Sequence, residues 1–203
     1  MSINYVVQAE VVDITADAPQ AADVFLVDTN VWYWMTYPNA TSNIPSRLSD
    51  YPNYLNNALG AGAKIHHSGL SLAELAHIIE KTEREIYEKT VGSIKPKEYR
   101  HNHHAERSRV VSEIQAAWGQ VKSLANPLTT CIDGPTTEAA LTRLTSEKVD
   151  GYDLFILDSM RNHGVIQLIT DDGDFATVHG IQVFTANRNV INAARGQGKL
   201  LTR

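Results

Sequence analysis

The chain has 203 residues, a formal net charge of −5 and a single cysteine. Hydrophobic residues make up 43% and charged residues 20%, which excludes wholesale disorder and collagen-like repeats and favours one globular domain, with or without an appendage. One cysteine excludes an internal disulfide, the apolar runs are too short for a membrane span, and residues 1–12 show no secretory signal, so we expect a cytoplasmic protein with no membrane segment. The net acidity argues against broad, non-specific binding to nucleic acid.

Predicted strands and helices alternate along the chain. In the first half, we expect an extended segment over 5–14, a polar link over 15–23 and a strand at 24–27. A helix should begin at about 31, capped by Asn30, and be followed by an interruption over 38–52. A helix over 54–59, a strand at 64–67 and a helix from 71 should come next. In the second half, we expect helices over 95–124, 136–144, 153–162 and 187–194, strands at 165–169 and 181–184, and a loose tail over 196–203. This alternation predicts a parallel α/β sheet.

Carboxylates follow the predicted strands at the points where the strands end. Asp28 ends the run 24–27, Asp171 and Asp172 follow 165–169, and Glu74 lies near the start of the helix after 64–67. In an open parallel sheet the carboxyl ends of the strands line the ligand crevice, where gathered carboxylates repel one another. Hard divalent ions such as Mg²⁺ or Mn²⁺ relieve this repulsion, so the sequence predicts a metal site that acts on phosphates.

Four segments resemble the acidic motifs of PIN-domain nucleases, and most closely those of the VapC-like toxin ribonucleases. The segments are VFLVDTNVW (Val24 to Trp32), the helix-opening Glu74, GYDLFILDS (Gly151 to Ser159) and LITDDGDF (Leu168 to Phe175). Their order and spacing match the family from Val24 to about Phe184. The resemblance implies a three-layer, Rossmann-like α/β/α fold with a parallel sheet, and hydrolysis of RNA phosphodiester bonds that depends on Mg²⁺ or Mn²⁺.

The resemblance also assigns roles to individual residues. It implies that the catalytic and metal-binding residues are Asp28, Glu74, Asp153 and Asp172. It implies auxiliary roles beside them for Thr29, Asn30, Asp171 and Asp174. RNA is then the substrate, and a homodimer and an antitoxin protein are the expected partners.

Two segments depart from the pattern of a small toxin. Residues 1–22 precede the first motif, and residues of about 90–126 form a long helical insert, so we expect an N-terminal extension, a nuclease domain over 23–195 and a tail over 196–203. The insert is locally basic through Lys95, Lys97, Arg100, Arg107 and Arg109. Contact with an RNA backbone, a neutral helical face and a partner-binding arm are alternative interpretations of this stretch.

Several of these residues also have a purely structural interpretation. Asp28 and Asn30 can form an Asx turn and a helix cap, and Glu74 can close a capping box with Ser71. Asp153 can stabilise the positive end of a helix dipole. The remaining expectations are an ion pair of Asp158 with Arg161, solvated turn positions for Asp171 and Asp174, and a small core position for Cys131.

The sequence therefore predicts a metal-dependent ribonuclease, with the toxin of a type II toxin–antitoxin pair as the first interpretation. A PIN nuclease of RNA processing or decay and a non-catalytic PIN-like binding module are the alternatives. A zinc site at His101 and His104 is not favoured, because no further ligand is arranged with them. The aromatic residues Trp32, Tyr33 and Trp34 beside the first motif can stack bases, although alternating aromatics more often pack in a core.

Overall fold

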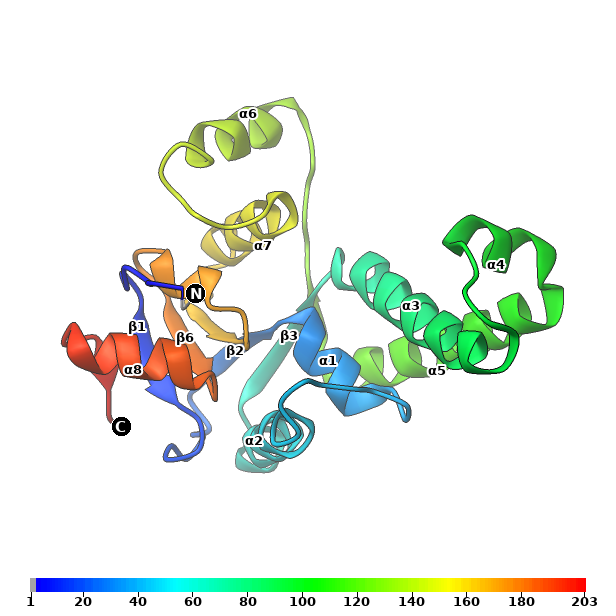
Figure 1. Ribbon diagram of the computed structural model, residues 1–203. Coiled ribbons are helices and arrows are strands. Elements are labelled where there is room, and N and C mark those ends of the chain that lie inside the picture. The colour runs from blue at the N-terminus through cyan, green and yellow to red at the C-terminus, as the bar shows by residue number, and fades with distance from the viewer. Residues whose placement is uncertain (1–2) are drawn as a thin grey trace.

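Seven parallel strands form one sheet with helices on both faces in the computed structural model, which describes residues 3–203 (Figure 1). The strands are β1 (Glu10–Asp13), β2 (Val24–Val27), β3 (Lys64–Ser68), β4 (Asn126–Leu128), β5 (Gln167–Ile169), β6 (Gln182–Thr185) and β7 (Leu200–Leu201). The helices are α1 (Thr29–Thr36), α2 (Arg47–Ala61), α3 (Ser71–Val91), α4 (Pro96–Asn102), α5 (His104–Leu124), α6 (Gly134–Arg143), α7 (Gly151–Asn162) and α8 (Arg188–Gly196), with a 3₁₀ turn η1 (Asp174–Thr177). The predicted α/β fold with three layers is confirmed.

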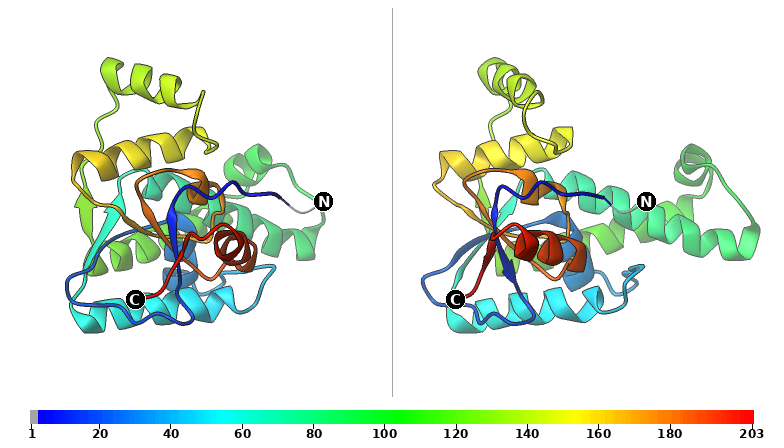
Figure 2. Two further views of the ribbon diagram at one scale, coloured as in Figure 1. Left: turned by 90° about the vertical axis from the view of Figure 1, so that its left-hand side faces the viewer. Right: turned by 60° about the vertical axis from the view of Figure 1, so that its left-hand side comes forward.

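Alternation of side chains along the strands separates two cores. Leu26 and Leu168 face the layer that contains α6, α7 and α8. Phe25, Ile169 and Phe184 face the opposite layer, which contains α1, α2, α3 and α5. Figure 2 shows the two layers on either side of the sheet. Because successive side chains of a strand point to opposite faces, strands of two to five residues suffice to build both cores.

The strand order is β4-β3-β2-β5-β6-β1-β7, so the chain moves outward in both directions from the pair β2 and β5. Val27 lies opposite Ile169 in this pair, and the backbone N–H of Asp28 donates to the carbonyl of Ile169 at 3.0 Å. The connections that leave β2 and β5 diverge to different layers. Such a switch point leaves a crevice at the carboxyl ends of the strands, which is where the acidic motifs begin.

A helical arm extends from one end of the sheet. Figure 1 shows α4 with the adjoining ends of α3 and α5 projecting away from the strands. A small core of Ile94, Tyr99 and Val110 holds the arm together. The helical stretch predicted over 95–124 is present as two helices, α4 and α5, which are separated at His103. The side chain of His103 pairs with the hydroxyl of Tyr87 at 3.0 Å.

Both ends of the described chain belong to the sheet. β1 lies between β6 and β7, so the predicted loose tail over 196–203 is wrong. The guanidinium of Arg203 forms ion pairs with Asp17 at 2.7 Å and Asp23 at 2.6 Å, and it lies over the ring of Phe184 at 4.7 Å. These contacts fix the C-terminal segment against the core.

Three further local predictions are wrong. Asp28 rather than Asn30 caps α1, which begins at Thr29. Helix α2 begins at Arg47 and continues through Pro52, so the interruption is shorter than expected. Cys131 is exposed and is no core residue.

Strand β4 has three residues, includes a proline, and was not predicted. Among the helices of residues 3–203, none is both long and apolar enough to cross a bilayer.

Candidate active site

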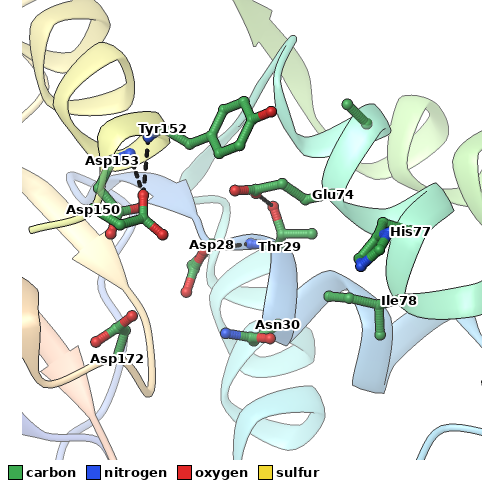
Figure 3. A pocket seen from close by; sticks show the side chains of 11 residues that line it. Asp28, Thr29, Asn30, Glu74, His77, Ile78, Asp150, Tyr152, Asp153 and Asp172 are labelled. Atoms are coloured by element: carbon green, nitrogen blue, oxygen red, sulfur yellow. Dashed lines mark hydrogen bonds between the residues drawn. The ribbon is translucent and has the colours of Figure 1, made fainter. Parts of the chain in front are cut away.

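Carboxylates from four separate elements line one pocket at the carboxyl edge of the sheet (Figure 3). The pocket has a volume of about 510 Å³. Asp28 comes from the end of β2, Glu74 from the first turn of α3, Asp153 from the first turn of α7, and Asp172 from the turn after β5. All four acids that the motifs predict therefore meet in one place.

Asp28 is oriented by the start of α1 and by the neighbouring strand. Its carboxylate accepts from the backbone N–H of Thr29 at 2.6 Å and from the hydroxyl of Thr170 at 2.7 Å. Thr170 reaches it because β5 is paired with β2 and Thr170 follows β5 directly. Asp28 therefore does cap α1, through the oxygen that accepts from Thr29. Its other oxygen accepts from Thr170, and the residue also lines the pocket.

The capping-box interpretation of Glu74 is wrong. Helix α3 begins at Ser71 without any side-chain cap, and the carboxylate of Glu74 instead accepts a hydrogen bond from the hydroxyl of Thr29. Figure 3 shows this contact joining α3 to the start of α1. Thr29 therefore contacts two predicted catalytic residues, Asp28 through its backbone N–H and Glu74 through its hydroxyl, and its auxiliary role stays a prediction.

The side chain of Asp150, and not that of Asp153, caps the N-terminus of α7. The carboxylate of Asp150 accepts from the backbone N–H groups of Tyr152 at 2.9 Å and Asp153 at 3.1 Å. The side chain of Asp153, which is 7% exposed, lines the pocket instead of the helix end. The helix-dipole role applies to both acids, yet only Asp150 contacts the free N–H groups of the helix.

The pocket concentrates negative charge, and no Lys or Arg is among the residues of 3–203 that line it. Burial, followed by repulsion from Asp28, Asp150, Asp172 and Glu74, raises the pKa of Asp153 to about 9. Burial also raises the pKa of Asp28 to about 7, against the hydrogen bond from Thr170 and with repulsion from Glu74 and Asp172. The pKa of Glu74 is raised by burial, which outweighs the hydrogen bond from Thr29.

This donor set fits a hard divalent ion. Of the described residues that line the pocket, none is Lys or Arg, and the acidic ones offer oxygen donors only. In residues 3–203, however, no three His, Cys, Asp or Glu side chains already converge closely enough to hold an ion. The charge and donor chemistry thus favour a cation, whereas the coordination itself is not prearranged.

The acids of the turn after β5 face in different directions. Asp172 lines the pocket, and its carboxylate accepts from the backbone N–H of Asp174 at 2.9 Å. Asp171 is buried on the other side, where it forms an ion pair with Arg47 and accepts from the hydroxyl of Tyr51 at 2.8 Å. The expectation of a solvated Asp171 is wrong, because this residue anchors the turn to α2. Asp174 opens η1 and is half-buried beside the turn.

Asp158, the weakest acid of the third motif, lies outside the pocket. Its carboxylate accepts from the amide of Asn162 at 3.0 Å, and Arg161 pairs with Glu147 at 2.9 Å. The expected pair of Asp158 with Arg161 is therefore wrong. Asp158 offers a control position on the same helix as Asp153.

The basic residues of the insert lie on the arm rather than around the pocket. Arg100 and Arg107 both pair with Glu80, and Arg109 pairs with Glu83 at 2.6 Å and with Glu106 at 2.9 Å. Lys95 and Lys97 are exposed. The three arginines thus join α3 to α4 and α5, and contact of this stretch with RNA stays a prediction.

Sequence reasoning missed several residues at the site. Asp150, Tyr152 and His77 line the pocket. A capping acid three residues before Asp153 was a usable local signal for Asp150.

No local signal identifies Tyr5. Its ring occupies the space beside Gly173 where a Cβ atom would project. Burial and repulsion from Asp174, Asp172 and Asp171 raise the pKa of the Tyr5 hydroxyl. The segment before β1 therefore packs against the acidic turn.

Three comparisons relate the chain to known proteins. A family model described as "PIN domain" matches residues 25–181. Among solved structures, the crystal structure of VapBC2 from Rickettsia felis bound to a DNA fragment from their promoter matches with 16% identity and a TM-score of 0.45, covering 80% of this chain and 98% of that chain. No curated protein matches the chain.

Proposed function

Because the chain belongs to the PIN-domain family, whose members are generally nucleases, we propose that it is a divalent-metal-dependent endoribonuclease. The observation that carries this proposal is that Asp28, Glu74, Asp153 and Asp172 line one pocket, to which the described residues bring no Lys or Arg. A phosphodiester brings further negative charge to this pocket, so a cation is required before substrate can bind there.

We propose that these four carboxylates hold Mg²⁺ or Mn²⁺. When bound, the cation supplies the positive charge that offsets the charge of the scissile phosphate and polarises the attacking water. Hydrolysis of this kind needs no covalent intermediate with a side chain. The protein's own contribution is to place the carboxylates and to exclude cationic side chains that would compete for them.

The neighbouring hydroxyl groups orient the carboxylates. Thr170 donates to Asp28, and Thr29 donates to Glu74, so each acid keeps one defined direction. The raised pKa values of about 7 for Asp28 and about 9 for Asp153 mean that, near pH 7, Asp28 is about half protonated and Asp153 is largely protonated. Both carboxyl groups would have to lose these protons to hold a cation, and we therefore expect activity to rise with pH across the neutral range.

The test is cleavage of single-stranded RNA by the purified protein with Mg²⁺, with Mn²⁺ and with EDTA. Asp28→Asn should reduce cleavage by at least about a hundredfold while the protein stays folded, since it removes one charge from the donor set. Asp158→Asn on α7 is the matched control and should cleave normally. A folded Asp28→Asn protein with full metal-dependent cleavage would refute the mechanism.

For the biological role, we propose a cytoplasmic toxin of a type II toxin–antitoxin pair, on the strength of the motif resemblance. An antitoxin protein and a second copy of this chain are the corresponding partners. Growth arrest on expression, relieved by Asp28→Asn and by a small neighbouring gene, is the expected result. Cleavage without growth arrest would favour RNA processing or decay, with the arm as the docking element, and an absence of any cleavage would favour a binding module.

A further inference from the structure

A second hollow adjoins the acidic pocket. It has a volume of about 330 Å³ and lies between α1, the loop of residues 41–43, the start of α2 and the middle of α3. Asn30 and Ile78 line both hollows. Figure 3 shows these two side chains at the border of the acidic pocket, below Thr29 and His77 in that view. The two hollows are therefore neighbours on the surface, with Asn30 and Ile78 at their common border.

One wall of this hollow is the indole of Trp34, which packs against two residues of α2. The indole of Trp34 packs on the buried ring of Tyr51, with ring centres 5.2 Å apart, and the guanidinium of Arg47 lies 5.9 Å from the indole centre. Arg47 and Tyr51 are four residues apart on α2, so both approach the indole from the same helix face. Both are fixed by Asp171, to which Arg47 is ion-paired and Tyr51 donates at 2.8 Å.

The loop of residues 41–43 is tied down on the other side. The backbone N–H of Thr41 donates to the hydroxyl of Tyr33 at 3.0 Å, and that hydroxyl pairs with the hydroxyl of Thr82 at 2.9 Å. The loop is thus connected to both α1 and α3. It brings the polar side chains of Thr41, Ser42 and Asn43 to the hollow, where an amide can pair with the edge of a base.

One positive charge at the rim is available to a ligand. The side chain of Lys81 is 61% exposed, and its ion pair with Glu85 spans 3.9 Å. An exposed pair of this length contributes little and is easily exchanged for another anion. The hollow therefore combines a fixed aromatic face, hydroxyl and amide groups and an ammonium group within a volume suited to one small planar group.

We propose that this hollow binds the base of a nucleotide next to the scissile phosphodiester in a single-stranded nucleic acid. The base stacks on Trp34, the loop of residues 41–43 contacts its edge, and Lys81 contacts the adjoining phosphate. This inference rests on the proposed nuclease function, because a polymer cleaved at the carboxylates must continue along the neighbouring surface. Stacking on an aromatic ring combined with a nearby cation is the usual mode of binding for unpaired strands.

The test uses the full chain and short RNA substrates with a mapped cleavage position. Loss of one stacked base contact lowers affinity by about tenfold or more, so Trp34→Leu should lower kcat/KM by at least that factor, and Trp34→Phe should retain most of it. Lys81→Ala should lower kcat/KM several-fold and reduce the salt dependence of binding. Lys89→Ala, an exposed lysine further along α3, is the matched control and should behave as the wild type.

Substrates without a base at one position separate stacking from a general loss of stability. Removal of the base on one flank of the cleaved bond should lower kcat/KM of the wild type about tenfold, whereas Trp34→Leu should be insensitive to that removal. If removal of the same base also lowers kcat/KM for single-stranded DNA, the contact is stacking of the base and does not depend on the sugar. Thermal unfolding of each variant is measured in parallel, and Lys81→Ala, whose side chain is exposed, keeps the test independent of folding.

The outcomes distinguish the subsite from the nuclease function itself. If the wild type cleaves neither RNA nor DNA, the proposed function fails. If the wild type cleaves but Trp34→Leu and Lys81→Ala match Lys89→Ala, and removal of either flanking base has no effect, the subsite is refuted and the nuclease stands. The subsite proposal would also be overturned if the protein preferred duplex over single-stranded substrates, or if a protein partner rather than an oligonucleotide covered the hollow at Trp34.

Discussion

Replacement of Asp153 by Asn should stabilise the protein at neutral pH while abolishing its activity. The pKa of Asp153 is about 9 in the folded protein and roughly 3.9 in an unfolded chain. The folded state therefore holds a proton that the unfolded state releases, and stability falls as pH rises from about 4 towards 9. At about 1.4 kcal/mol per pH unit the cost reaches at most about 4 kcal/mol at pH 7, and coupling to Asp28 reduces it to roughly 2–4 kcal/mol.

An asparagine removes this cost because it is neutral in both states and has nearly the shape of the protonated acid. Denaturant unfolding in EDTA, followed by circular dichroism at pH 4, 6 and 7.5, measures the difference between the two proteins. We expect near-equal stability at pH 4 and a growing advantage for Asp153→Asn above it. Millimolar Mg²⁺ should narrow the gap, since the ion stabilises only the folded protein that binds it.

A pH-independent difference, or a variant that is less stable at pH 7.5, would refute the electrostatic reasoning. Asp158→Asn on the same helix is the matched control, because Asp158 does not line the pocket and its carboxylate accepts a hydrogen bond from Asn162 within its own helix. Its unfolding free energy should change by less than about 0.5 kcal/mol at every pH. Parallel RNA-cleavage assays separate the gain in stability from the loss of function.

Three further predictions concern contacts around the site. Gly173→Ala should destabilise the protein by roughly 1–3 kcal/mol in thermal unfolding, because the new methyl group meets the ring of Tyr5. Tyr5→Ala in the same chain should restore part of the loss. If Gly173→Ala destabilised the protein equally with and without the Tyr5 side chain, this contact would be contradicted. Glu83→Ala should cost roughly 1–3 kcal/mol in denaturant unfolding, because it leaves the buried hydroxyl of Tyr37 without its acceptor, whereas the exposed Glu85→Ala should cost little. Arg203→Ala should lower the melting temperature, since it leaves two buried carboxylates unpaired, and an unchanged melting temperature would show that the C-terminal segment is not held.

Much of the site could be predicted because it follows a rule about strands. Asp28 and Asp172 follow short apolar runs, and the carboxyl ends of parallel strands necessarily meet at one edge of the sheet. Spacing alone could not decide which turn acid faces the pocket, and only the motif resemblance favoured Asp172 over Asp171. Asp171 and Asp172 are neighbours in the same turn, and the choice depends on Arg47 and Tyr51, which lie more than a hundred residues earlier.

Elements held by distant partners could not be predicted. Strand β7 has two residues and forms because it pairs with β1, which lies near the other end of the sequence. Helix α2 continues through Pro52 because Tyr51 and Arg47 are anchored from outside the helix, which offsets the missing backbone donor of the proline. In each case a tertiary contact outweighs local propensity.

The position of β1 between β6 and β7 has a consequence for the order in which the fold is completed during synthesis. Glu10 lies opposite Gln182, and the side chains of these residues are hydrogen-bonded across 172 positions of sequence. Strand β1 therefore has no β6 partner until residues 182–185 have left the ribosome, and Asp172 of the acidic pocket emerges only shortly before them. We expect β1 and the acidic pocket to be completed together late in the synthesis of residues 10–185, after most of the helices have emerged.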